Sequence, residues 1–173
     1  DYDYLIIAAG ITLDYGGIKG LEEIGDAYSA GDASKILKVF GDSGVTSVYN
    51  IDSSAHMWEQ SQKFIDRAKK EKVNAIFTAP NTAVKCGGAP KKVMYLLNSR
   101  LNEAKVRANV TLTYYDDSGR LFGVKEYADA IEKQFITRDM KWNLNHNLTS
   151  VDISKKIATF NKHWEEQGAF DAD

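Results

Sequence analysis

The sequence of 173 residues contains a single cysteine and two prolines, and it lacks several common functional signatures. One cysteine excludes a disulfide within the chain and a Cys-x-x-Cys metal or redox pair. The apolar run at residues 5–9 is far too short to cross a bilayer. Lys and Arg total 22 against 24 for Asp and Glu, and the resulting net charge of −2 is not typical of a nucleic-acid-binding protein. These absences leave a globular protein with one thiol.

The patterns that are present predict a parallel α/β sheet. Predicted strands cover residues 2–9, 74–79, 109–115, 141–148 and 156–160, and predicted helices cover residues 34–40, 52–70, 90–103 and 124–135. The rest of residues 11–51 is rich in glycine and is expected to be irregular. Alternation of strand and helix is the order of parallel strands joined by crossover helices. We therefore predict a Rossmann-like three-layer parallel sheet with an extra strand at the N-terminus.

The loop at residues 80–90, PNTAVKCGGAP, follows a predicted strand and precedes a predicted helix. Ligands bind beyond the carboxyl ends of the strands in such sheets, and a nicotinamide-binding turn has the pattern G-x-G-x-x-G. This loop has only the glycine pair Gly87-Gly88, which disfavours a dinucleotide site. Asp116-Asp117 after the next strand is interpreted as a turn before Ser118-Gly119, because a ribose-binding acid needs that fingerprint. The three histidines show no spacing typical of a metal site.

The same loop presents Cys86 in an electropositive setting. Lys85 is adjacent, Lys91 and Lys92 begin the helix that Pro90 opens, and the helix N-terminus favours an anion. Such surroundings lower the pKa of a thiol and increase the population of the nucleophilic thiolate. The alternative is an inert cysteine buried as a small apolar residue. The sequence leaves both interpretations open.

Three stretches together resemble the sulfide:quinone oxidoreductases, a family of flavoproteins. The loop in NAIFTAPNTAVKCGGAPKKVMYL is similar to the region around a redox-active cysteine of that family. YDYLIIAAGITLDYGGIKGL resembles the segment where the family's chain leaves its FAD domain, and LFGVKEYADAI resembles a strand-to-helix turn. The likeness keeps its order and spacing over residues 2–160.

The resemblance implies an FAD-dependent enzyme that oxidises sulfide, reduces quinone and holds a sulfur intermediate between two cysteines. It implies that residues 1–20 end an FAD-domain segment, residues 21–170 form an inserted second Rossmann-like domain, and residues 171–173 return to the FAD domain. Cys86 matches one redox cysteine, and the second is absent from these residues. Expected cofactor contacts are Ala9, Gly10, Asn81, Thr82, Lys85, Gly87 and Gly88. The family associates with membranes through a C-terminal segment, so this stretch alone is expected to be soluble, inactive and without FAD.

Three alternatives remain. The flavin subunit of flavocytochrome c sulfide dehydrogenase shares the fold, but its cysteine loop usually has a Cys-Pro-Pro pattern in place of Cys86-Gly87-Gly88. An NADH-dependent disulfide reductase would need the missing glycine fingerprint and a cysteine pair. The third alternative is a non-catalytic Rossmann-like module with a structural cysteine. His146 lies on an apolar strand face in all of these interpretations and is expected to be a packing residue.

Overall fold

The computed structural model describes residues 2–49 and 51–162 of the chain. Within these residues the elements are α1 (Glu22–Ser29), α2 (Ala33–Phe40), α3 (Ile51–Ala68), β1 (Val73–Thr78), α4 (Ala89–Glu103), the 3-10 turn η1 (Arg107–Asn109), β2 (Val110–Asp116), α5 (Lys125–Thr137), β3 (Met140–Leu144), β4 (His146–Asp152) and β5 (Ile157–Lys162). The four predicted helices correspond to α2, α3, α4 and α5 and are confirmed.

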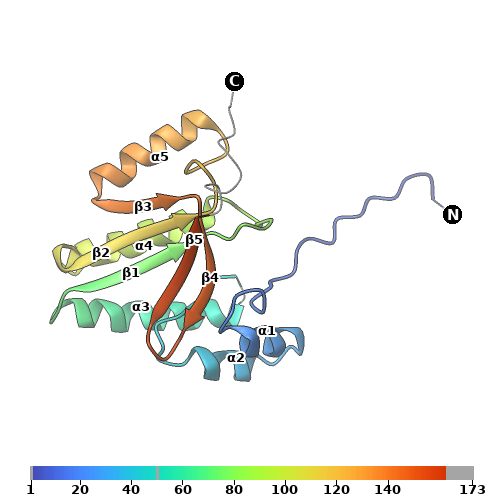
Figure 1. Cartoon of the computed structure of the whole chain (residues 1–173), viewed down its shortest axis with the longest axis horizontal. Coiled ribbons are helices and arrows are strands. Elements are labelled where there is room, and N and C mark those ends of the chain that lie inside the picture. The colour runs from blue at the N-terminus through green and yellow to red at the C-terminus, as the bar shows by residue number, and fades with distance from the viewer. Residues whose placement is uncertain (1, 50, 163–173) are drawn as a thin grey trace.

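The central feature is a parallel sheet with the strand order β1-β2-β3 (Figure 1). The middle strand β2 pairs Leu112 with Ala75 of β1 on one side and with Met140 of β3 on the other. α4 joins β1 to β2, and α5 joins β2 to β3. Because such crossovers are right-handed and both step in the same direction along the sheet, both helices lie on the same face. The predicted α/β fold with crossover helices is confirmed.

The main hydrophobic core lies between this face of the sheet and helices α3, α4 and α5. Its fully buried side chains include Met94, Leu101, Leu112, Tyr114 and Phe135. The ring of Phe135 makes edge-to-face contacts with Tyr114 and Trp142, with ring centroids 6.0 and 5.8 Å apart. Alternation along β2 buries Val110, Leu112 and Tyr114, as their spacing in the sequence predicts.

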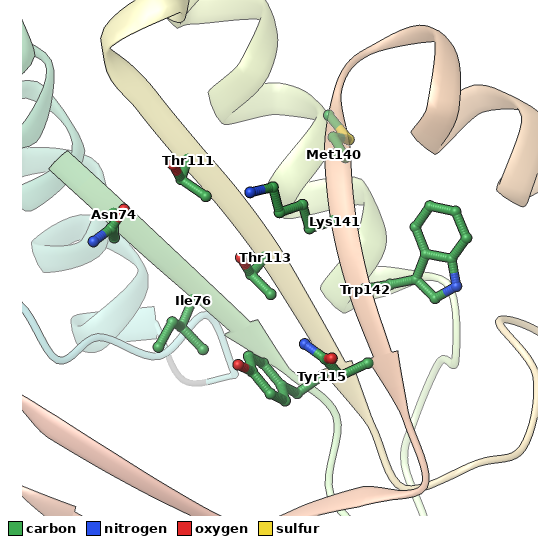
Figure 2. Close-up of a pocket in the computed structure, with 9 residues that line it drawn as sticks. Asn74, Ile76, Thr111, Thr113, Tyr115, Met140, Lys141 and Trp142 are labelled. Carbon is green, nitrogen blue, oxygen red and sulfur yellow. The ribbon is translucent and has the colours of Figure 1, made fainter. Parts of the chain in front are cut away.

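The opposite face of the sheet is left uncovered over much of its area by the described residues. Side chains from all three strands line a broad, shallow hollow of about 700 Å³ there, among them Asn74, Ile76, Thr111, Thr113 and Lys141 (Figure 2). The predicted three-layer arrangement is therefore incomplete in the described part of the chain. The reason is topological, because two crossovers of the same hand and direction supply helices to one face only.

A separate antiparallel sheet is formed by β4 and β5. The single strand predicted over residues 141–148 is wrong, because the chain turns at Asn145, whose φ of 60° lies in the left-handed region that asparagine tolerates. The predicted strand at 156–160 exists as β5, but it pairs with β4 and does not join the parallel sheet. Phe160 of β5 stacks on Tyr115 of β2, with ring centroids 4.0 Å apart, and this contact joins the two sheets.

Helices α1 and α2 form a second, smaller core, which the sequence analysis did not resolve. Its buried residues are Leu21, Ile24, Ala27, Ile36 and Phe40. α1 was not predicted because Gly25 was interpreted as a turn former. A Cβ atom on Gly25 would lie 2.6 Å from the backbone nitrogen of Gly16, so the glycine permits close packing inside a helix.

The strand predicted at residues 2–9 is not formed. These residues extend away from the rest of the described chain (Figure 1), and Tyr4, Ile6 and Ile7 are 91%, 88% and 81% exposed. A strand requires a neighbour for its backbone N–H and C=O groups, and no segment among residues 10–49 and 51–162 pairs with it. The segment is thus an exposed apolar extension.

Candidate functional site

The loop that carries Cys86 connects the end of β1 to the start of α4, at the carboxyl edge of the parallel sheet. Open parallel sheets bind ligands at this edge. Cys86 is exposed. Its exposure argues against the packing interpretation, because a cysteine that fills space in a core is removed from solvent.

A tight turn holds Cys86 at the N-terminus of α4. The backbone N–H of Ala89 donates to the carbonyl oxygen of Cys86 at 3.1 Å, and that of Lys92 donates to the carbonyl oxygen of Gly88 at 2.9 Å. α4 is 15 residues long, and its N-terminus provides partial positive charge near the thiol. A Cβ atom on Gly87 would meet only the ring of Phe122, at 3.9 Å. The glycines therefore leave the surface beside Cys86 without bulk.

One of the three lysines expected around the thiol has a different role. Lys91 points into the protein and is 4% exposed. Its Nζ lies 3.1 Å from Asp116 Oδ2 and 2.8 Å from the Tyr114 hydroxyl. Because Asp116 balances its charge, Lys91 adds little positive potential at Cys86. Lys85 and Lys92 are exposed and remain the cationic side chains of the loop.

Asp116 and Tyr114 complete this buried group at the end of β2. The Tyr114 hydroxyl donates to Asp116 Oδ2 at 2.8 Å. The other carboxylate oxygen of Asp116 accepts from the backbone N–H of Ser118 at 3.1 Å, which confirms the turn predicted there. Burial and the negative charge of Asp116 raise the pKa of the Tyr114 phenol far above its ordinary value, so Tyr114 stays protonated and acts as a donor.

Tyr49 is a further residue near the thiol. Burial raises the pKa of its phenol, and the negative charge of the Cys86 thiolate raises that pKa further. Its hydroxyl is buried and has no hydrogen-bond partner among the described residues. Tyr49 comes from the connection before α3, so the fold brings a segment distant in sequence to the Cys86 loop.

The structure places the other predicted contacts in two regions. Asn81, Thr82 and Lys85 are exposed on the same loop as Cys86, together with Gly87, and Gly88 is half-buried at the start of α4. Ala9 lies instead on the exposed N-terminal extension and Gly10 directly follows it, and the described residues contain no hydrogen bond from either residue to the loop. Gly10 has a φ of 76°, which glycine adopts without strain.

Sequence reasoning missed the group of Lys91, Tyr114 and Asp116, although two periodicities contain it. Lys91 precedes the buried Met94 by three residues and so lies on the same helical stripe. Tyr114 and Asp116 follow the buried Leu112 at alternate positions of β2. Extending both patterns to polar residues would have predicted a lysine and a carboxylate on facing core surfaces.

His146 is half-buried, as expected of a packing residue. Its Nδ1 lies 2.7 Å from the carbonyl oxygen of Leu144, and its ring contacts Tyr115 edge to face.

No helix within residues 2–49 and 51–162 has both the length and the apolar character that crossing a membrane requires. The site at the Cys86 loop thus consists of an exposed thiol, a helix N-terminus, two exposed lysines and a buried polar group below.

Comparison with known proteins gives a consistent result. The chain is 38% identical over 159 residues to the mitochondrial sulfide:quinone oxidoreductase of Mus musculus and 35% identical over 160 residues to that of Dictyostelium discoideum. Each match covers 92% of this chain and 31% of the relative, so the chain spans about a third of the length of these relatives. No protein-family model matches.

Solved structures show the same fold. The sulfide:quinone oxidoreductase of Aquifex aeolicus superposes with a TM-score of 0.60 at 20% identity, over 93% of this chain and 34% of that chain. A chain of the mitochondrial ATP synthase assembly of Tetrahymena thermophila superposes with a TM-score of 0.59 at 16% identity, over 90% of this chain and 35% of that chain. At these identities the two likenesses establish the fold alone.

Proposed function

Because this chain is homologous to one segment of the mitochondrial sulfide:quinone oxidoreductases, we propose that it belongs to a flavoprotein that oxidises sulfide and reduces quinone through FAD. Within it, Cys86 carries the sulfur intermediate. The observation that supports this role most directly is the exposure of the chain's single cysteine at the carboxyl edge of a parallel sheet.

The chemistry requires a nucleophilic thiol that can bind and release sulfur. In the overall reaction, the Cys86 thiol, hydrogen sulfide and quinone give the Cys86 persulfide and quinol. A sulfur–sulfur bond forms, and two electrons and two protons pass to the quinone. A further nucleophile then removes the outer sulfur and regenerates the thiol. The thiolate is the attacking and leaving species in this exchange, and the N-terminus of α4 with the nearby Lys85 and Lys92 places positive charge beside the sulfur.

The loop has the surface that an FAD site beside Cys86 needs. Gly87 and Gly88 present backbone without side chains, and a Cβ atom at either position would meet no atom closer than 3.8 Å. A planar ring can approach such a surface closely, and Asn81, Thr82 and Lys85 supply polar and cationic contacts beside it. Ala9 and Gly10 would contact the cofactor from the N-terminal extension. FAD, when bound, supplies the two-electron acceptor that connects sulfide oxidation to quinone.

The domain and membrane assignments form part of the same proposal. Residues 1–20 end an FAD-domain segment, residues 21–170 form an inserted Rossmann-like domain, and residues 171–173, which lie outside the described residues, return to the FAD domain. The natural protein that contains these 173 residues associates peripherally with a membrane, where quinone dissolves. The 173 residues alone bind no FAD and oxidise no sulfide, because they contain neither a G-x-G-x-x-G motif nor a second cysteine.

The experiment is sulfide-dependent quinone reduction by the natural protein that contains this chain. Cys86→Ser is compared with Ser99→Ala, a matched surface substitution on the exposed side of α4. The proposal predicts that Ser99→Ala keeps wild-type turnover and that Cys86→Ser loses it while retaining FAD absorbance. Undiminished turnover in Cys86→Ser would refute the role of Cys86. Turnover with cytochrome c and none with quinone would favour the flavocytochrome alternative.

A further inference from the structure

The Cys86 turn lies above a buried polar group formed by Lys91 of α4 with Tyr114 and Asp116 of β2. The three residues are 4%, 0% and 5% exposed. Lysine and aspartate are almost never buried to this extent unless they are paired. Charge pairing alone does not account for the arrangement, because Lys91 also contacts the loop.

The Lys91 ammonium group has three donors, and each has an acceptor. Nζ lies 3.1 Å from Asp116 Oδ2, 2.8 Å from the Tyr114 hydroxyl and 3.2 Å from the carbonyl oxygen of Gly87. Gly87 directly follows Cys86 in the chain. The third contact therefore joins the buried group to the peptide unit beside the thiol.

Tyr114 and Asp116, the side-chain acceptors of Lys91, are themselves held by several contacts. Tyr114 donates to Asp116 at 2.8 Å, and Asp116 accepts from the backbone of Ser118 at 3.1 Å. The Nζ atom also lies 4.6 Å from the centre of the Tyr114 ring, over its face. Tyr114 in turn packs against Phe135 in the main core. The acceptors of Lys91 thus belong to the rigid centre of the fold.

We propose that Lys91 is a positioning residue, which holds the Cys86 turn in a fixed place relative to the end of the parallel sheet through its bond to the Gly87 carbonyl. The proposal rests on the proposed function, in which Cys86 must meet both sulfide and the electron acceptor in defined geometry. Displacement of a reacting group by about 1 Å can reduce a rate by about a hundredfold. A single anchor next to the thiol therefore has a direct effect on turnover.

The effect is geometric and not electrostatic. The charge of Lys91 is balanced by Asp116 at 3.1 Å, whereas Lys92, its neighbour in sequence, is exposed. Removal of the Lys92 charge changes the potential around Cys86 and leaves the anchor intact. Removal of Lys91 together with the Asp116 charge leaves the net charge unchanged and removes the anchor. Comparison of the Lys92 variant with the Lys91/Asp116 variant therefore separates an electrostatic effect on Cys86 from a loss of positioning.

The test compares Lys91→Met/Asp116→Asn with Lys92→Met in the natural protein that contains this chain. The asparagine keeps an oxygen acceptor for Ser118 and a polar partner for Tyr114, so no buried charge is left unpaired. For the double variant we expect kcat for sulfide-dependent quinone reduction to fall by about tenfold or more, with the KM for quinone unchanged. Lys92→Met removes a charge beside the thiol but keeps the anchor, so we expect it to leave the Cys86 turn as firmly closed as in wild type; Ser99→Ala, on the exposed side of α4, should stay within about twofold of the wild-type kcat.

A second measurement does not depend on activity. The amide of Ala89, bonded to the Cys86 carbonyl, should exchange with deuterium about tenfold faster in the double variant than in wild type or in Lys92→Met, because the turn opens more often. Wild-type exchange and wild-type kcat in the folded double variant would overturn the proposal. If Cys86→Ser keeps full turnover, the proposed function fails, and Ala89 exchange still decides whether Lys91 anchors the turn.

Should the double variant not fold, Lys91→Gln/Asp116→Asn is measured in its place. It leaves no buried charge, and glutamine is too short to reach the Gly87 carbonyl, so the same changes in kcat and exchange are expected. Wild-type values of both in this variant would likewise contradict the anchoring role.

Discussion

Replacement of Lys91 alone by methionine should destabilise the fold strongly. The substitution keeps the length and apolar stem of the side chain but leaves the Asp116 carboxylate, 5% exposed, without its cation. Removal of one partner of a buried ion pair typically costs about 3–5 kcal/mol, because the remaining charge stays desolvated. The Tyr114 hydroxyl still donates to Asp116 at 2.8 Å, which places the expected loss near the lower end of that range.

The assay is reversible urea unfolding followed by circular dichroism, with thermal unfolding in parallel. For a chain of this size each kcal/mol shifts the melting temperature by about 2–4 °C, so a loss near 3 kcal/mol should make Lys91→Met melt about 6–12 °C below wild type. The double variant Lys91→Met/Asp116→Asn should recover most of this loss, because it leaves no buried charge. The two substitutions should therefore be strongly non-additive.

Two stability results would contradict the buried ion pair. If Lys91→Met loses less than about 1 kcal/mol, the pair is solvated and not buried as the structure has it. If the double variant is less stable than Lys91→Met, the ion pair is not what the single substitution disrupts. Lys92→Met serves as the control and should be close to neutral, since Lys92 is exposed.

Three further predictions concern the rest of the fold. Arg107→Ala should cost about 2–4 kcal/mol, since this guanidinium donates to three backbone carbonyls, and lysine should not restore the loss. Gly20→Ala should destabilise by more than about 1 kcal/mol, whereas Gly31→Ala should cost less, because the new Cβ meets the Val151 carbonyl oxygen at 2.0 Å only in the first case. Tyr114 should not ionise before unfolding: its raised pKa gives stability that is complete below pH 10.0 and declines at higher pH, as ultraviolet titration against unfolding would detect.

The parallel sheet was predictable because local pattern and tertiary burial agree there. The alternation of Val110, Leu112 and Tyr114 in β2 identifies the face that packs on the helices, and these residues are buried. Gly and Pro residues mark the ends of the loop between β1 and α4, so the position of Cys86 at the sheet edge followed from the sequence. The hydrophobic effect determines both the pattern and the packing in this region.

Other elements depend on interactions that a local pattern does not contain. Alternation of apolar residues continues through Asn145, so the break between β3 and β4 is visible only in its φ of 60°. Glycine is typical of turns, but Gly25 lies inside α1 and permits its close packing against Gly16. The extension at residues 2–9 has the composition of a strand, but strand formation requires a hydrogen-bonding neighbour that the described residues do not provide.

The candidate site was predicted in its exposed part and missed in its buried part. Polar side chains at core positions depart from the simple rule that periodic apolar residues define the core, so Lys91 was expected among the cations around the thiol. Its burial depends on Asp116, which lies 25 residues later in the chain. The helical pattern alone does not identify this partner; the alternation along β2 must be extended to its polar residues as well. The structure therefore removes Lys91 from the expected sources of positive potential at Cys86 and leaves Lys85, Lys92 and the helix N-terminus.

The mass of the Cys86 peptide during turnover decides whether Cys86 carries the sulfur intermediate. The natural protein that contains this chain is mixed with sulfide and one equivalent of quinone without air, quenched with an alkylating agent and digested. If Cys86 carries sulfur, this peptide gains the mass of one or more sulfur atoms, dithiothreitol removes the gain, and quinol forms in step with it. Quinol formation with an unmodified Cys86 peptide would rule out a sulfur carrier at Cys86.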